Sequence, residues 1–239
     1  MKVLPITLGV SRGGKTGGAE GTPSGPAPLP PDLRARILKR DGNRCRCCGF
    51  EAAKYQEILH INGDHADTRP GNLATTCIFC HQCFHLDRVG PMESGVLIWM
   101  PEIPQAYIHH IARAIYVARI TQGEAAAGAA RRALEIIMAR MEEAKRRIGT
   151  EDPFVLAAVL SDYLGPRQYA AREAKIRGLR LFPRDRRMVQ EANLKFNQFP
   201  QILAYWRSKA GPFAQRAPRE WAKIYLDIMA KAAQAKKAA

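Results

Sequence analysis

The residues with the clearest chemistry are four cysteines arranged as two Cys-x-x-Cys pairs. Cys45 and Cys48 form the first pair, and Cys77 and Cys80 form the second. Each pair can place two thiolates on one side of a metal from a single tight turn, and Gly49 supplies permissive backbone directly after the first pair. Cytosolic thiols stay reduced, so two such pairs in a chain without an export signal favour metal over disulfides. We predict one structural zinc ion in a closed four-thiolate site, with no position left for activating water.

Two further cysteines leave another assignment open. Cys47 lies inside the first pair, and Cys83 forms a second possible Cys-x-x-Cys with Cys80. We prefer Cys77 and Cys80 as the second pair. About 28 residues separate the pairs, more than in a usual zinc ribbon, so a compact unit must fit between them. The plainest alternative is a set of unrelated buried thiols.

The pattern around the cysteines predicts an α+β fold that is mostly α. Helical periodicity starts at Asp32 and stops at the turn residues 41–43. The apolar run 95–100 predicts a strand, after which a helix begins near Pro104 and breaks at Gly123. Further helices are predicted over 129–148, 154–164, 167–177, 184–196, 200–209 and from Pro218 onward.

These elements divide the chain into three parts. Residues 1–31 hold a short strand at 2–8 and a flexible Gly/Pro-rich linker from residue 11. Residues 32–90 form the zinc-binding unit. Residues 91–239 form a helical region whose last part is strongly basic.

Composition favours a globular protein with an anionic partner. The chain has 239 residues, 46% of them hydrophobic, with a formal net charge of +15 and a pI near 9.9. Residues 165–239 contain roughly 17 Lys and Arg but only about 5 Asp and Glu. This positive charge suits binding to nucleic acid, a membrane surface or an acidic protein segment. Without a long apolar span or an export pattern, we expect a cytoplasmic protein.

Residues 34–85 resemble the HNH nuclease fold, in which a Cys-x-x-Cys knuckle precedes a ββα unit. The segments KRDGNRCRCCG, LHINGDHADTRPGNL and CIFCH occur in the same order, and Asn72 stands before the second knuckle as in that fold. The resemblance implies an HNH-like ββα zinc unit.

The resemblance to HNH nucleases also assigns catalytic positions. His60 would be the general base and His81 the distal ligand of a catalytic divalent metal. The position of the first metal ligand, however, holds Leu59, which cannot coordinate; Asp64 or His65 would substitute only if the loop rearranged. We therefore predict no catalytic residues.

A longer stretch, residues 39–188, resembles the IcmJ/DotN family of Dot/Icm type IVB secretion systems. The features with most weight are the cysteines, Phe84, the stretch 95–102 and the triplet 181–183. The resemblance implies a non-catalytic subunit of the coupling complex, peripheral to the cytoplasmic side of the inner membrane. Its implied partners are the C-terminal extension of the coupling ATPase and a membrane-anchored subunit, at a place where substrates are recruited.

Three hypotheses therefore remain open. The first is a zinc-containing adaptor of a type IVB secretion or conjugation coupling complex. The second is an HNH endonuclease, complete or degenerate. The third is a nucleic-acid-binding protein that uses the basic C-terminal part, which we consider less favoured than a protein partner.

Overall fold

The structure is a computed structural model that describes residues 3–11, 29–120 and 123–214. Helices predominate in this part of the chain, and the strands form two-stranded antiparallel sheets. In chain order the elements are α1 (Pro31–Arg40), β1 (Gln56–His60), η1 (Pro70–Asn72), β2 (Leu73–Cys77), α2 (Ile78–His81), η2 (Gln82–Phe84), α3 (Leu86–Met92), β3 (Gly95–Trp99), α4 (Gln105–Arg119), α5 (Glu124–Met138), α6 (Arg140–Ile148), α7 (Pro153–Ala158), the π-helical turn η3 (Val159–Tyr163), α8 (Pro166–Ala170), α9 (Arg172–Lys175), β4 (Leu179–Pro183), β5 (Met188–Glu191), β6 (Leu194–Asn197) and α10 (Phe199–Arg207).

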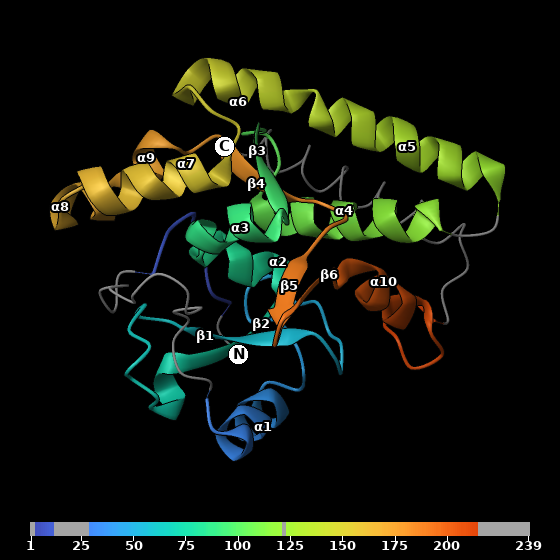
Figure 1. The fold of residues 1–239 in the computed structure, drawn as a ribbon, viewed down its shortest axis with the longest axis horizontal. Helices are drawn as coiled ribbons and strands as arrows, with labels where there is room; N and C mark the ends of the chain where they lie inside the picture. Colours follow the sequence, from blue (N-terminus) through green and yellow to red (C-terminus); the bar gives the residue numbers. More distant parts are fainter. Residues whose placement is uncertain (1–2, 12–28, 121–122, 215–239) are drawn as a thin grey trace.

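The region of the cysteines has the element order β–β–α. Strands β1 and β2 pair antiparallel, from Gln56 opposite Cys77 to His60 opposite Leu73, and α2 follows β2 directly. Helix α1 lies against this sheet at one end of the molecule (Figure 1), where buried Ile37 contacts Leu73. The sheet thereby brings the second cysteine pair into the interior.

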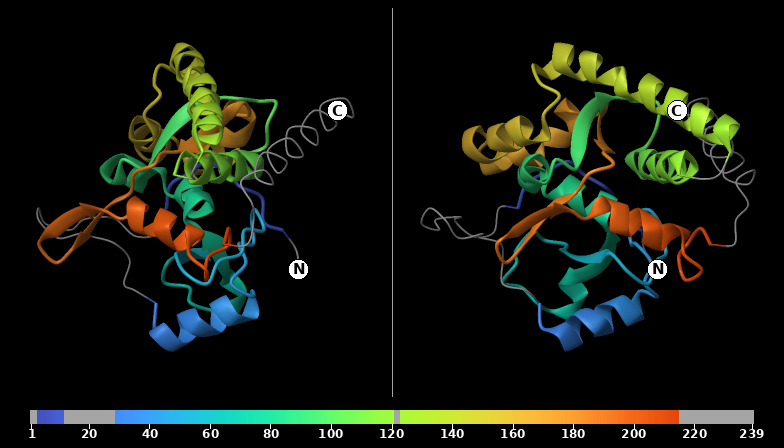
Figure 2. Two further views of the ribbon diagram at one scale, coloured as in Figure 1. Left: turned by 90° about the vertical axis from the view of Figure 1, so that its right-hand side faces the viewer. Right: turned by 45° about the vertical axis from the view of Figure 1, so that its right-hand side comes forward.

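The second half of the fold surrounds sheet β3–β4. Gly95 lies opposite Pro183 and Trp99 opposite Leu179, so the paired residues are 80 to 88 positions apart in sequence. Helices α5 and α6 form a nearly continuous rod, in which α5 lies over α4 and α6 over β3 (Figures 1 and 2), because Ala139 between them keeps helical backbone angles. The largest apolar core joins side chains of the cysteine region to α4, β4 and α10.

Several predicted elements are confirmed. Helix α1, strand β3, the start of α4 and helix α10 lie where the sequence patterns place them. The long amphipathic helix at 129–148 corresponds to α5 and α6, and the helix at 154–164 to α7 with η3. The segment 167–177 contains two short helices, α8 and α9, and the helix predicted from Pro218 lies outside the described residues.

Two predicted elements are wrong. The predicted helix at 184–196 is instead the hairpin β5–β6, which stands out beside the body of the protein in Figure 2. The predicted short strand at 2–8 is absent from its described residues 3–8. This segment instead donates a backbone hydrogen bond from Leu4 to Arg46, and Leu8 is buried beside Cys83 and Leu86.

Asp41 links the end of α1 to β2. It is 4% exposed, forms a bidentate ion pair with Arg40 at 2.9 Å, and accepts a hydrogen bond from the amide of Thr75 at 2.8 Å. Burial alone would raise the pKa of Asp41, but the hydrogen bonds from Arg40 and Thr75 outweigh burial and lower it. The carboxylate is therefore more stable in the folded than in the unfolded protein.

We expect Asp41→Asn to reduce the free energy of unfolding by about 1–3 kcal/mol at neutral pH, because the substitution removes the buried negative charge and one of the oxygens that accept from Arg40 and the Thr75 amide. The Asp41 carboxylate stabilises the fold above its unfolded pKa, near 3.8. This contribution is lost as pH falls through the lower folded pKa, so the difference from wild type should shrink there. Urea unfolding at several pH values measures it, with exposed Asp32→Asn as the control. An equal loss in both variants would contradict this role.

Candidate metal centre

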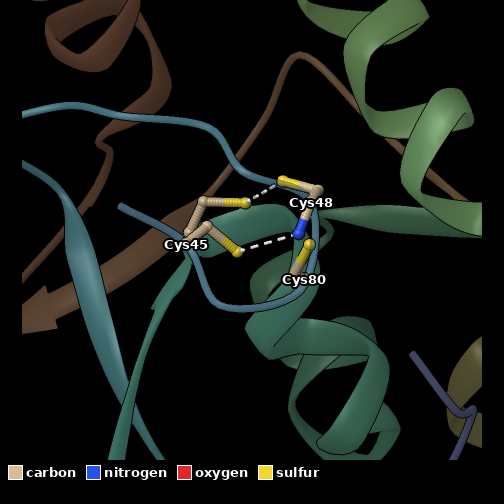
Figure 3. A group of neighbouring side chains, drawn as sticks. Cys45, Cys48 and Cys80 are labelled. Atoms are coloured by element: carbon tan, nitrogen blue, oxygen red, sulfur yellow. Dashed lines mark hydrogen bonds between the residues drawn. The ribbon is translucent and has the colours of Figure 1, made fainter. Parts of the chain in front are cut away.

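A tight turn and a strand-to-helix junction position the four predicted cysteines. The first turn is closed by the amide of Gly49, which donates to the carbonyl of Cys45 at 2.9 Å, and Gly49 adopts φ +75°, a region that favours glycine. The amide of Cys48 points to the sulfur of Cys45 at 3.5 Å (Figure 3). Cys77 ends β2 and Cys80 lies one turn into α2, so strand and helix present the second pair from the opposite side.

The four sulfur atoms have the spacing of a tetrahedral thiolate site. Their Sγ atoms all lie within 4.8 Å of one another, and those of Cys48 and Cys77 are 3.7 Å apart. A tetrahedron with metal–sulfur bonds of about 2.3 Å has edges of about 3.8 Å. The six cysteines of the chain are free thiols, so no disulfide competes for these sulfurs. The geometry therefore fits one four-coordinate, thiophilic metal ion.

Burial makes this cluster dependent on positive charge. Cys77 and Cys80 are 1% and 0% exposed, and burial raises the pKa of both thiols well above the ordinary value. A divalent ion would reverse this preference, because coordination deprotonates a thiol. A bound metal would therefore convert four buried groups that repel one another as anions into a stable centre.

Arg113, on α4, supplies a fixed positive charge to the cluster. Its guanidinium donates to the sulfur of Cys77 at 2.7 Å and approaches the sulfur of Cys48 at 4.0 Å. The side chain is 1% exposed and stacks over Phe50 at 3.9 Å. Burial would lower the pKa of Arg113, but the neighbouring thiolates outweigh burial and raise it. Four thiolates around a divalent ion carry a net charge of about −2, and Arg113 offsets part of it.

His109, one turn before Arg113, holds the other side of the cluster. Its Nδ1 lies 3.2 Å from the sulfur of Cys80, and its Nε2 lies 2.9 Å from Nε2 of Gln105. The Gln105 amide also exchanges two hydrogen bonds with the backbone of Leu181, at 2.7 and 2.9 Å. Because Gln105 donates to Nε2, Nδ1 carries the hydrogen and donates to Cys80. Gln105, itself held by the backbone of β4, thus orients the His109 ring toward Cys80.

The two alternative cysteines lie beside the four. Cys47 is buried within the first turn, and its thiol contacts those of Cys45 and Cys80. Cys83 contacts the carbonyl of Phe79 at 3.5 Å and Nε2 of His109 at 3.7 Å. Among the residues that the structure describes, the mutual 4.8 Å spacing is met by the four predicted cysteines and by no other group of possible ligands.

The HNH-equivalent residues lie apart from the cysteines. His60 and His81 belong to one group of imidazoles, joined through His65 and His85 with ring centroids 4.4–5.6 Å apart. Asn72 instead fastens the loop after β1, accepting from the Asn62 amide at 3.0 Å. Its side chain also donates to the carbonyl of Asp67 at 2.9 Å.

The surroundings keep the four imidazoles neutral. Burial is the main cause in each case, lowering the pKa of His60, His65 and His85 and that of His81 to about 3. Leu59, at the position of the missing HNH ligand, is 4% exposed and buried with the apolar core.

Sequence reasoning did not single out Gln105, His109, Arg113 or His85. The first three recur every four residues on α4, which places them on one face of the helix. That face is buried although it is polar. Polar residues that recur every four positions beside an apolar stripe could have indicated that this face contacts a polar or charged site. His85 follows His81 at the same spacing.

Comparison with known proteins places this chain in a family, although no family model matches it. The type 4 apparatus protein DotN of Legionella pneumophila subsp. pneumophila (strain Philadelphia 1) is 33% identical over 152 residues. The match covers 62% of this chain and 70% of the relative. No helix among the described residues is long and apolar enough to cross a membrane. The extent of the match to DotN shows that the chain belongs to the IcmJ/DotN family of type IV secretion apparatus proteins.

Proposed function

We propose that this protein is a non-catalytic, zinc-containing adaptor subunit of a type IVB secretion or conjugation coupling complex. The observations that carry the proposal are the similarity to DotN and the cluster of four cysteine sulfurs in this chain. Four thiolates fill the coordination sphere of zinc, so the ion would stabilise an HNH-like ββα unit and activate no water. The protein would lie at the cytoplasmic side of the inner membrane, bound to a membrane-anchored subunit.

The proposed partner is the C-terminal extension of the coupling ATPase. The chain has a net charge of +15, which suits an acidic segment, and it has an exposed apolar face on α7 and η3. Val155, Val159 and Tyr163 on this face are 45%, 42% and 78% exposed. Exposed aliphatic and aromatic side chains on one helix are typical of a protein interface.

Co-expression with that extension should give a complex that elutes as one species in size-exclusion chromatography. The triple variant Val155→Ser, Val159→Ser and Tyr163→Ser should weaken it by more than about tenfold, since buried apolar contacts set the dissociation rate. Ile136→Ser, at a 68% exposed position on α5, is the matched control. Raising salt should slow association more than it speeds dissociation. Separate elution, with tight salt-sensitive DNA binding by this protein alone, would favour a nucleic-acid binder instead.

The second candidate is an HNH endonuclease, favoured by the grouping of His60 and His81 in one cluster. We expect no appreciable Mg²⁺-dependent nicking of plasmid DNA, because Leu59 removes one ligand of the catalytic ion. Nicking by wild type that disappears in His60→Ala, while that variant keeps its cysteine-bound metal, would support the nuclease.

A further inference from the structure

Residues 3–11 form an extended strap, dark blue in Figure 1, that has no helix or strand of its own. The strap lies in a groove between two parts of the fold that are far apart in sequence. On one side are η2 and the start of α3, and on the other are α8 and α9. Leu8 is 6% exposed and Val10 is 7% exposed, and both belong to one apolar cluster with Leu86 and Leu181. The second half of the strap is therefore anchored in the core.

The zinc-unit side of the groove holds the strap by its backbone. The Gly9 amide donates to the Cys83 carbonyl at 2.9 Å, and the Gly9 carbonyl accepts from the Leu86 amide at 3.0 Å. Proteins that recognise extended peptides use main-chain hydrogen bonds of this kind for affinity and side-chain pockets for specificity. The strap is thus held in the way that a folded protein holds a separate peptide.

Two side chains of the helical region complete the groove. Oη of Tyr169 accepts from the Val10 amide and donates to the Val10 carbonyl, both at 2.9 Å. The Arg172 guanidinium donates to the Leu8 carbonyl at 2.8 Å and lies 3.3 Å from Oγ1 of Thr7. It also stacks over the Tyr169 ring at 3.9 Å, so the two side chains fix each other. Together they hold the backbone on both sides of the intervening glycine.

The groove also has a sequence preference. Leu8 and Val10 enter the apolar cluster, and the residue between them must be glycine. A Cβ on Gly9 would lie 2.6 Å from Oη of Tyr169 and 3.0 Å from a guanidinium nitrogen of Arg172. Tyr169 could move away only by giving up its two hydrogen bonds with Val10. The groove therefore fits an extended segment with the pattern apolar-Gly-apolar.

The strap also closes one side of a cavity of about 540 Å³. Five residues of the strap line part of its wall, and residues 59–64, at the end of β1 and in the loop after it, line another part. Nε2 of His65, in the same loop, lies 2.8 Å from Oγ of Ser11 and fastens the end of the strap. Displacement of the strap would remove one wall of the cavity and join groove and cavity into one surface.

We propose that the strap is an intramolecular peptide ligand, which occupies a groove for extended apolar-Gly-apolar segments and closes the cavity beside it. Its release exposes both, and a segment of the same pattern from another polypeptide can then take its place. The strap is thus an autoinhibitory contact, which competes at a high effective concentration because it belongs to the same chain. This interaction goes beyond the adaptor role, since it uses neither the apolar face on α7 and η3 nor the metal centre.

Fluorescence anisotropy of a labelled synthetic peptide with the sequence of residues 3–11 tests this proposal on the full-length protein. Leu8→Ser/Val10→Ser weakens the protein's own strap and leaves the groove intact, so this variant should bind the peptide at least about tenfold more tightly than wild type. A peptide carrying Gly9→Ala should bind the variant at least about tenfold more weakly. Adding Tyr169→Phe should weaken binding as well, whereas Tyr163→Phe, at a 78% exposed position outside the groove, is the matched control and should leave it unchanged.

Three results would overturn the proposal: no binding of the peptide to either protein, equal affinity for wild type and the strap variant, or equal binding of the Gly9→Ala peptide. If the strap variant does not fold, hydrogen exchange of wild type decides without any substitution. The amides of Gly9, Val10 and Leu86 should exchange together and faster than those of sheet β3–β4, because release of the strap frees all three. Exchange at the rate of the sheet would make the strap a fixed part of the fold and exclude its release.

Discussion

Cys77→Ser protein is expected to be recovered insoluble or unfolded, without the zinc ion that we propose for the cysteines. Structural zinc contributes about 10–16 kcal/mol of apparent free energy in small zinc units. That is as large as the whole stability of a typical domain, about 5–15 kcal/mol. Cys77 is also 1% exposed at the junction of β2 and α2, so the serine hydroxyl would be buried among the other sulfurs and the Arg113 guanidinium without supplying a thiolate ligand.

The matched control for this loss is Cys47→Ala. Cys47 is also buried, and its thiol contacts those of Cys45 and Cys80, but it is not one of the four sulfurs that lie within 4.8 Å of one another. This variant should fold and keep one tightly held zinc after passage over a chelating resin, which removes weakly bound ions. Elemental analysis and circular dichroism provide the measurements. A folded Cys77→Ser protein with full zinc content, or wild type without zinc, would refute the assignment.

Arg113→Ala is expected to lower the free energy of unfolding of the metal-bound protein by about 3–5 kcal/mol, because it removes the cation that offsets buried thiolates. It would also empty the space between Phe50 and Phe79, over which the guanidinium stacks at 3.9 and 5.0 Å. Zinc release to a competing chelator should also become faster, because the thiolates lose their countercharge.

Two comparisons separate charge from packing at Arg113. Arg113→Lys keeps the charge but loses the planar stacking, so it should fall between wild type and Arg113→Ala. Arg119→Ala, six residues further along α4, removes a partly exposed ion pair with Asp185 and should cost about 0–1 kcal/mol. If all three variants release zinc at the wild-type rate, the countercharge has no role in holding the metal.

Local sequence patterns predicted the elements whose signals lie close together in the chain. The two Cys-x-x-Cys pairs, the helix after Asp32 and the strand ended by Pro101 depend on neighbouring residues, and the structure contains them. Strand β4 has no such signal. It forms because β3, more than 80 positions earlier, offers an unpaired edge, and contacts of that range leave no trace in a local window.

The hairpin β5–β6 shows where local propensity misled the prediction. Its segment contains good helix formers, including Glu191, Ala192 and Lys195. The chain turns at Ala192, which adopts φ +51°, a conformation that alanine rarely takes and that no turn rule would assign to it. Asn197 instead fixes the base of the hairpin, accepting from the Arg187 amide at 2.9 Å.

The candidate metal centre was foreseen only in part for a related reason. Ligands could be read from cysteine spacing, but the residues around them depend on which face of α4 packs against the knuckles. Helical periodicity predicted the apolar stripe of α4, but it did not predict that α4 packs against the cysteine region. The division at residue 90 likewise stays a prediction, although the main core contains side chains from both sides of it.

The position of Arg113 bears on the order of events during synthesis. All four cysteines have emerged from the ribosome before α4 has been completed, so zinc could be captured by a nascent chain that still lacks its countercharge. Such an early centre would carry its full negative charge and exchange metal readily. Docking of α4 would then bring Arg113 to the cluster and slow metal exchange. The last folding step of this region would therefore also be the step that fixes the ion.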